Sequence, residues 1–313
     1  MADNVLGVLF GDIADAIRGK TGDTATMKPA EFPEKINGIE VGTGGGSLPA
    51  GVYWKPKNIA LKNGNKKSLG TYNGNLYIFG SKSATDTYLE GVYKYNGSGW
   101  DTIISGQNIS YPIPGSVMYV EYHGKLHMIG MEDYKLHYTF DGTSIATMNE
   151  FPNGASYWAL FVQNDTLKFY SVKDGKVYVW NEAADTWSEE ANTGKQYSYL
   201  SFFTINGAVY AVDSSKVYTY NGSTLTQVAT WNAQPSICCS HGDCIYSMKS
   251  QSYRPFALVE FNTKTNTVRD VGDLPYSSSY SGYSLFSYEG NLCHYSNYSG
   301  SYAGLNALYE VSE

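Results

Sequence analysis

Tight turns followed by short apolar stretches recur six times between residues 72 and 313. Each turn joins Asn, His or Glu to Gly or Asp, and an apolar residue opens the stretch behind it. These apolar residues are spaced by 35 to 50 positions: Leu76, Leu126, Leu167, Val209, Cys244 and Leu292. Asn-Gly between alternating runs is a strong hairpin signal, because type I′ turns need positive φ at both central residues. The pattern predicts strand a, a tight turn and strand b in each unit.

Alternating polar and apolar residues form the second half of each unit, which usually ends in an aromatic residue and Asn or Asp. The segments are 92–96, 136–141, 177–181, 217–221 and 258–262, and the sixth is 308–311. They predict strand c, followed by a short turn and strand d. Repeats of about 43 residues built from short strands indicate a propeller or another repeat array. The interpretation is an all-β, six-bladed propeller.

The sixth unit stops at strand c, so its outer strand must come from elsewhere in the chain. Residues 50–61 precede the first strand a, and Trp54 there matches the place of Trp100 and Trp187. A strand lent from this segment ties the two ends of the propeller together. It also removes an exposed sheet edge.

The third and fifth units carry the sequence features of a known repeat. Trp180 and Asn181 are followed by Thr186 and Trp187, and the fifth unit repeats this layout from Phe261 and runs on to Leu274-Pro275. This arrangement resembles the kelch repeat over about 240 residues. The paired glycines that usually end strand b in that family are here Gly80-Ser81 and Gly130-Met131, and later units lack them.

The first forty residues form a different kind of sequence. Apolar residues recur at helical spacing and predict one helix, and a second short helix runs from Pro29 to about Ile36. Two helices of this length bury too little surface to fold alone, so we expect them to associate with copies or with a larger partner. The attachment residues are Leu6, Leu9, Phe10, Ile13, Ile17, Phe32 and Ile36. Residues 41–49 are a Gly-rich linker, and residues 50–313 form the propeller.

A longer pattern within this segment is similar to one found in bacteriophage tail and baseplate proteins. Its core is Ile13-Ala14-Asp15-Ala16-Ile17-Arg18-Gly19-Lys20-Thr21-Gly22, followed by a polar spacer and Pro29 to Ile36. The resemblance implies a virion component, made in the bacterial host cytoplasm, that attaches to other tail or baseplate proteins. It also implies a homo-oligomer, with a trimer as one candidate. A helical leader without that role is the alternative.

Net charge and hydropathy narrow the range of partners. The chain of 313 residues has a formal net charge of −7, which offers no basic surface for nucleic acid or anionic lipid. No stretch approaches the roughly 20 apolar residues of a membrane span. We therefore expect neither nucleic acid binding nor membrane insertion.

Propeller geometry sorts the connections between strands onto two faces. The a–b and c–d turns share one face, and the b–c loops and d–a crossings share the other, where tyrosines gather. Tyr supplies amphipathic contact area at low entropic cost, as in antibody paratopes, although many of the 29 tyrosines belong to sheet packing. The candidate ligand-binding residues are Tyr88, Tyr111, Tyr134, Tyr157, Trp158, Tyr197, Tyr199, Tyr253, Arg254, Tyr280, Tyr283, Tyr298 and Tyr302.

Catalytic and metal-binding patterns are weak. Cys244 falls in the slot of Leu76, so it is interpreted as a buried apolar residue, and the spacing of Cys239, His241 and Cys244 matches no usual zinc site. A Cys239–Cys244 disulfide would need an oxidising compartment. No cofactor and no metal are expected. Loop carboxylates leave a hydrolytic pair open: Asp86, Glu132, Asp133, Asp174 and Asp213.

These observations favour a tail-tip or tail-fibre protein whose propeller binds a bacterial surface glycan or protein. Weak binding by each copy would be strengthened by several copies on one virion. Two alternatives stay open. One is a structural decoration of the baseplate without host contact, and the other is a carbohydrate-active enzyme that acts on an envelope polymer.

Overall fold

Strands account for the regular structure of the described residues, and they form six four-stranded sheets in a computed structural model. The first two sheets are β2 (Lys66–Tyr72), β3 (Asn75–Ser81), β4 (Leu89–Tyr95) and β5 (Trp100–Ser105), then β6 (Tyr119–Tyr122), β7 (Lys125–Ile129), β8 (His137–Phe140) and β9 (Ile145–Met148). The next two are β10 (Leu160–Val162), β11 (Leu167–Ser171), β12 (Lys176–Asn181) and β13 (Thr186–Asn192), then β14 (Ser201–Ile205), β15 (Ala208–Val212), β16 (Lys216–Tyr220) and β17 (Leu225–Thr230). The last two are β18 (Cys238–His241), β19 (Cys244–Lys249), β20 (Ala257–Asn262) and β21 (Thr267–Asp273), then β22 (Tyr283–Tyr288), β23 (Asn291–Ser296), β24 (Gly304–Val311) and β1 (Gly51–Pro56).

The structure describes residues 51–56, 66–81, 89–106, 119–130, 135–152, 160–197, 200–234, 237–249, 257–273, 283–296 and 304–311. The predicted helical segment and the linker lie outside the described residues. One compact unit spans Val52–Tyr309, and it is the part discussed below. In the described part of the chain, no helix has the length and apolar character needed to cross a bilayer.

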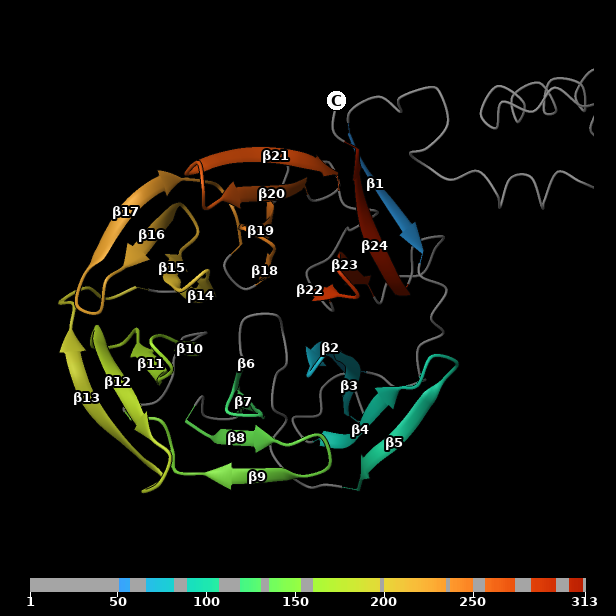
Figure 1. Ribbon diagram of the computed structural model, residues 1–313, viewed down its shortest axis with the longest axis horizontal. Helices are drawn as coiled ribbons and strands as arrows, with labels where there is room; N and C mark the ends of the chain where they lie inside the picture. The colour runs from blue at the N-terminus through green and yellow to red at the C-terminus, as the bar shows by residue number, and fades with distance from the viewer. Residues whose placement is uncertain are drawn as a thin grey trace, which may run out of the picture. The chain divides into compact units, whose positions relative to one another are not determined.

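Within this unit the sheets are arranged around a centre, with their first strands innermost (Figure 1). Apolar side chains join each sheet to its neighbours. The first and last sheets also pack together, because Leu69 and Ile78 share a buried cluster with Phe286 and Tyr295. Sheets that pack face to face in a closed ring form a β-propeller. The all-β propeller predicted from the repeats is therefore the observed fold.

Backbone dihedrals explain why the a–b turns form where the sequence predicts them. Asn73 and Gly74 have φ of 46° and 70°, and Asn206 and Gly207 have φ of 51° and 79°. Asn tolerates the left-handed region and Gly enters it without steric cost, so these pairs suit two-residue hairpin turns. The register confirms the hairpins, since Tyr72 pairs directly with Asn75.

One hairpin differs from the prediction by one residue. His241 pairs with Cys244, so the two turn residues are Gly242 and Asp243, and only Gly242 has positive φ. The slot of Leu76 is then filled by Ile245, which pairs with Ser240 and is fully buried. The assignment of Cys244 to that slot was wrong. A Gly at the first turn position supports a tight turn one residue later than the His-Gly pattern indicates.

Strand β1 is hydrogen-bonded beside β24 at the outer edge of the last sheet, in the order β1-β24-β23-β22. Residues 51–56 thus supply the outer strand that the sixth unit lacks. Trp54 lies in this strand, and its side chain falls outside the described residues. The sheet edge at the end of the repeat array is covered by a segment from before the first repeat, as its position in the sequence predicts.

Candidate functional site

Most of the predicted ligand-binding residues lie outside the described residues. Tyr283 lies in β22, but its side chain is outside the described residues. Eleven other members of this group lie entirely outside the described residues: Tyr88, Tyr111, Tyr134, Tyr157, Trp158, Tyr199, Tyr253, Arg254, Tyr280, Tyr298 and Tyr302. The predicted attachment residues Leu6, Leu9, Phe10, Ile13, Ile17, Phe32 and Ile36 also lie outside them.

Tyr197 is the member of the predicted set whose side chain is described. It follows β13 and is partly buried, with its ring centroid 5.6 Å from that of Tyr218 at an edge-on angle of 69°. The Tyr170 ring lies 6.4 Å away. Burial raises the pKa of Tyr197 above its ordinary value. Packing between neighbouring sheets therefore accounts for much of its surface.

Two carboxylates considered for hydrolysis are described, and both are bound to their own b–c turns. Asp213 Oδ1 accepts hydrogen bonds from the backbone N–H groups of Ser215 and Lys216, each at 2.7 Å, and Oδ2 accepts one from the Tyr218 hydroxyl at 2.8 Å. Asp174 repeats the pattern with the N–H of Lys176 at 3.2 Å. These contacts order the turn. Asp86, Glu132 and Asp133 lie outside the described residues.

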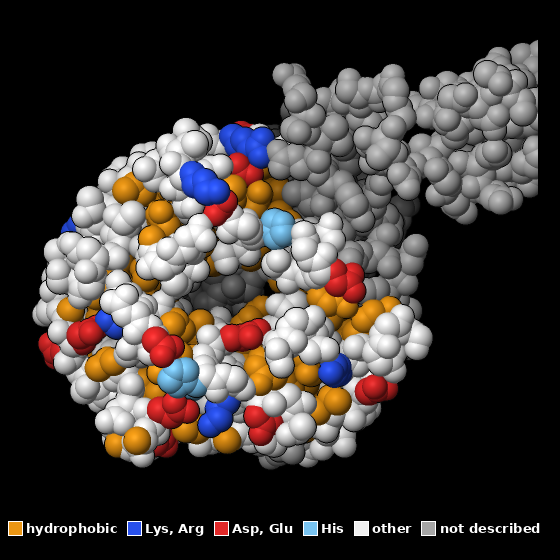
Figure 2. Space-filling model, in the orientation of Figure 1, with side chains coloured by type: hydrophobic (Ala, Val, Ile, Leu, Met, Phe, Trp, Pro, Cys, Tyr) orange, Lys and Arg blue, Asp and Glu red, His pale blue; other side chains and the backbone are white. Residues whose placement is uncertain are grey.

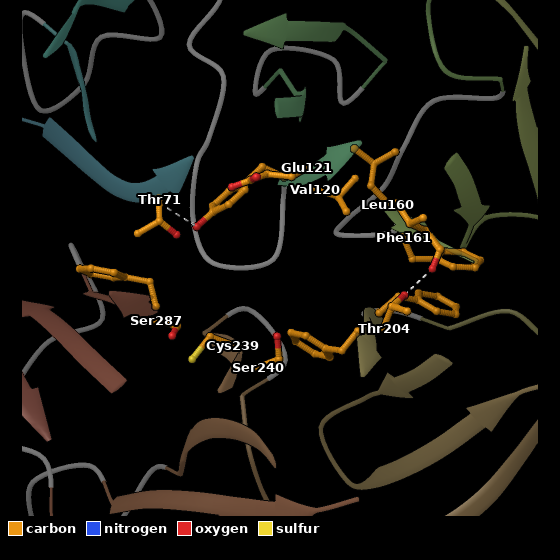
Figure 3. Close-up of a pocket in the computed structure, with 14 residues that line it drawn as sticks. Thr71, Val120, Glu121, Leu160, Phe161, Thr204, Cys239, Ser240 and Ser287 are labelled. Atoms are coloured by element: carbon orange, nitrogen blue, oxygen red, sulfur yellow. Dashed lines mark hydrogen bonds between the residues drawn. The ribbon is translucent and has the colours of Figure 1, made fainter. Parts of the chain in front are cut away.

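A cavity of about 380 Å³ opens at the centre of the propeller, and all six innermost strands line it (Figures 2 and 3). Each sheet contributes the residue two positions before its a–b turn, in the same register. In the first hairpin Thr71 pairs with Leu76, and in the fourth Thr204 pairs with Val209. The six equivalent residues are Thr71, Glu121, Val162, Thr204, Ser240 and Ser287. The cavity therefore lies toward the face of the a–b turns.

Hydrogen bonds around the cavity join neighbouring sheets. Glu121 Oε1 accepts a hydrogen bond of 3.0 Å from the Asn73 N–H. The Thr204 hydroxyl donates to the Val162 carbonyl (Figure 3). Nδ1 of His241 lies 3.0 Å from the Ser287 hydroxyl. These contacts hold the innermost strands in fixed positions around the cavity.

The rest of the lining is largely apolar. Phe161, Phe203, Phe286 and Cys239 are buried, with at most 6% of their surface exposed. Burial raises the pKa of the Cys239 thiol well above its ordinary value, so the group stays neutral and is a poor nucleophile. Burial also raises the pKa of Tyr119 to about 12. The wall of the cavity is therefore uncharged at neutral pH except at Glu121.

Glu121 carries the one ionisable carboxyl among the residues that line this cavity. Its side chain reaches solvent through the opening, and desolvation by the surrounding protein nevertheless raises its pKa, against the opposing effect of the Asn73 hydrogen bond. The described residues contain no group of three or more His, Cys, Asp or Glu that would hold a metal ion. All four cysteines are free thiols, so Cys239 and Cys244 are not bridged.

Sequence reasoning missed this cavity because it looked for function in the long loops. The signal lay in strand a, where Thr71, Thr204 and Ser287 place a hydroxyl two residues before the turn. Aligning the repeats on their turns would have shown that position to be polar in most units. A polar residue that recurs at one register position of an inner strand indicates a shared, solvent-facing channel.

Comparison with known proteins supports the fold. No protein-family model matches the chain, and no curated protein matches it in sequence. Among solved structures, the lectin SapL1, solved in complex with alpha methyl fucoside, is similar with a TM-score of 0.53 and 13% identity, over 80% of this chain and 94% of that one. A streptogramin B lyase structure has a TM-score of 0.47 and 9% identity, over 83% of this chain and 98% of that one.

Proposed function

We propose that this chain is a receptor-binding protein of a bacteriophage tail, with three parts. Residues 1–40 would form a helical segment that attaches to other tail or baseplate proteins, and residues 41–49 a flexible linker. Residues 50–313 would form a six-bladed, kelch-like propeller in which each sheet is one blade. The propeller would bind a glycan or protein of the bacterial surface, and the similarity of residues 11–36 to tail proteins supports the virion role.

The observation that carries the binding role is the difference between the two faces of the propeller. On one face the a–b turns have two residues each, as at Asn73-Gly74, and hydrogen bonds between sheets fix them. On the other face several connections are much longer, such as 106–118 between β5 and β6 and 274–282 between β21 and β22, and they lie beside short b–c turns such as 213–215. Long connections on a rigid frame are the usual place for recognition.

The composition of those connections supports a ligand with hydroxyl groups. The segment 274–282 contains Tyr276 and Tyr280 among four serines, and 297–303 contains Tyr298 and Tyr302. Tyrosine rings stack on sugar rings and serines adapt their hydrogen bonds. Similarity in fold to a lectin solved with a fucoside makes a glycan the first ligand class to test. Single sites of this kind bind weakly, and several copies on one virion would raise the avidity.

The proposal is tested with the full-length chain, fluorescently labelled, on candidate host cells and on a glycan array. We expect saturable binding to a restricted set of strains, and competition by an excess of unlabelled protein. Alanine replacement of Tyr298 and Tyr302 should weaken binding at least tenfold, whereas Glu182→Ala on the turn face serves as the control and should leave it unchanged. Folded variants that bind host cells like the wild type would favour a structural role on the baseplate instead.

A further inference from the structure

Among the described residues that line it, the central cavity has one carboxylate and no Lys, Arg or His. Glu121 is its ionisable carboxyl, and no Lys, Arg or His within the described residues forms an ion pair with it. Its hydrogen bond from Asn73 reaches Oε1 and leaves Oε2 without a protein donor in that part of the chain. Glu121 is exposed to solvent, and its carboxylate attracts a cationic partner through the Coulomb interaction. The cavity therefore favours a positively charged guest.

Neutral acceptors line the same cavity as this carboxylate. Thr71, Ser240 and Ser287 come from three other sheets and line the same cavity with their hydroxyl groups (Figure 3). Hydroxyl oxygens accept hydrogen bonds from an ammonium group, which has three donors to place. The apolar wall of the cavity includes Phe161 and Phe286, which are 1% and 2% exposed. A guest with an ammonium head and a short hydrocarbon body matches both the polar and the apolar part of the lining.

The number of charged groups in the cavity and the volume of the cavity favour a small organic cation over a metal ion. A divalent ion usually takes several carboxylates or carbonyls, and the described residues hold no cluster of three or more acidic, His or Cys side chains for it. One carboxylate balances one positive charge. A cavity volume of about 380 Å³ lies at the lower end of the range for small-molecule sites.

We propose that the central cavity binds a small organic monocation, with its ammonium group against Glu121 and its hydrocarbon part against the apolar wall. The site lies toward the face of the a–b turns, whereas host recognition is proposed for the opposite face. The two proposals are therefore independent, and the assay below does not involve host cells or glycans.

The first test compares two probes of equal size on the wild-type full-length protein. Propylammonium chloride and propan-1-ol differ in charge, and each is titrated while backbone amide resonances are followed by NMR. We expect propylammonium to bind with a Kd of roughly 1 mM and to shift the amides of Thr71, Glu121 and Ser287. Propan-1-ol should bind at least tenfold more weakly. Equal shifts from both probes, or none at these amides, would overturn the proposal.

The second test changes the carboxylate. Glu121→Gln keeps the size of the side chain and removes its charge, so propylammonium affinity should fall at least about tenfold. Glu182→Gln removes a carboxylate that contacts His123 outside the cavity, and it should leave the affinity unchanged. Glu121→Asp keeps the charge and should retain measurable binding, which also covers the case in which Glu121→Gln does not fold. Loss of affinity in Glu182→Gln but not in Glu121→Gln would contradict the assignment.

Discussion

His127 and His137 lie side by side in the interior of the second sheet, with Nδ1 of His127 2.9 Å from Nε2 of His137. Both side chains are buried, at 2% and 0% exposure. The His137 ring also lies 4.8 Å from the Phe151 ring and 4.9 Å from the Trp180 ring. With both imidazoles neutral, one ring donates its N–H to the unprotonated nitrogen of the other, and the hydrogen bond is lost when both rings become protonated.

Acid should therefore destabilise the propeller at a pH where most proteins still hold their carboxylates ionised. Burial lowers the pKa of His127 to about 4 and that of His137 well below its ordinary value, with His127 adding to the effect on His137. Below pH 6.5 these histidines become protonated in the unfolded chain, whereas in the folded chain His127 becomes protonated only near pH 4. The free energy of unfolding should fall across that window, by on the order of 1 kcal/mol or more.

Thermal unfolding between pH 7.5 and 4.5 and histidine NMR titration check this directly. The C2 protons of His127 and His137 should not titrate above pH 5. His123 is the internal control, because its hydrogen bond to Glu182 raises its pKa above the ordinary value. A midpoint near 6.5 for either buried histidine would show that the pair is open to water.

An ion pair between the buried Glu260 and the half-exposed Arg269 in the fifth sheet gives a second prediction. Glu260 is 4% exposed and accepts hydrogen bonds from Arg269 Nε at 2.8 Å, Arg269 Nη2 at 2.9 Å and the Tyr246 hydroxyl at 2.7 Å. Burial opposes ionisation, but the bonds from Arg269 and Tyr246 outweigh it, so the pKa of Glu260 lies below its ordinary value. Arg269→Met would leave this carboxylate without its cation and should destabilise the protein by about 2 kcal/mol.

Lys249→Met is the matched control, because Lys249 pairs with the more exposed Asp270 across the same sheet. It should change the free energy of unfolding by less than about 0.5 kcal/mol in urea denaturation. Similar values for the two variants would mean that the Glu260 pair is as weak as a surface pair.

The hairpins and the propeller were predictable because their causes are local. Asn73-Gly74 and Asn206-Gly207 set their turns through backbone dihedrals, and alternation sets the faces of the strands that follow. The one-residue error at Cys244 has the same origin, since His241-Gly242 resembles His123-Gly124 while the turn falls one residue later. Only the pairing of β18 with β19 shows which two residues form the turn.

The central cavity and the side-chain contacts around it form between strands that are far apart in the sequence. Glu121 contacts Asn73 from a neighbouring sheet, 48 positions away, and no local pattern shows that contact. In the sequence, Glu260 is one polar residue in the alternating pattern of β20. Its pairing with Arg269 becomes visible only when β20 and β21 are in register. Sequence patterns thus predict the strands and turns better than they predict the contacts between side chains of different strands.

Asp213 supplies a third prediction, which separates a turn-ordering carboxylate from a catalytic one. Asp213→Ala removes acceptors for two backbone N–H groups and for the Tyr218 hydroxyl, so we expect a loss of about 2 kcal/mol in the free energy of unfolding. Glu189→Ala on the outer strand β13 should cost less than about 0.5 kcal/mol. A variant of Asp213 with unchanged stability would leave this carboxylate available for another role.

Gly207 tests whether the repeated turns hold the propeller together. Its φ of 79° lies in the region that side chains disfavour, although a Cβ added there would meet no atom within 4 Å. Gly207→Ala should therefore destabilise the protein by about 1 kcal/mol through backbone strain alone. Gly99→Ala is the matched control, since its Cβ would also meet open space and its φ is not positive. Urea denaturation of both variants should show a loss only for Gly207→Ala. Equal stability of the two variants would mean that the turn relaxes to another conformation, and the type I′ geometry would not be what sets the register of the β14–β15 hairpin.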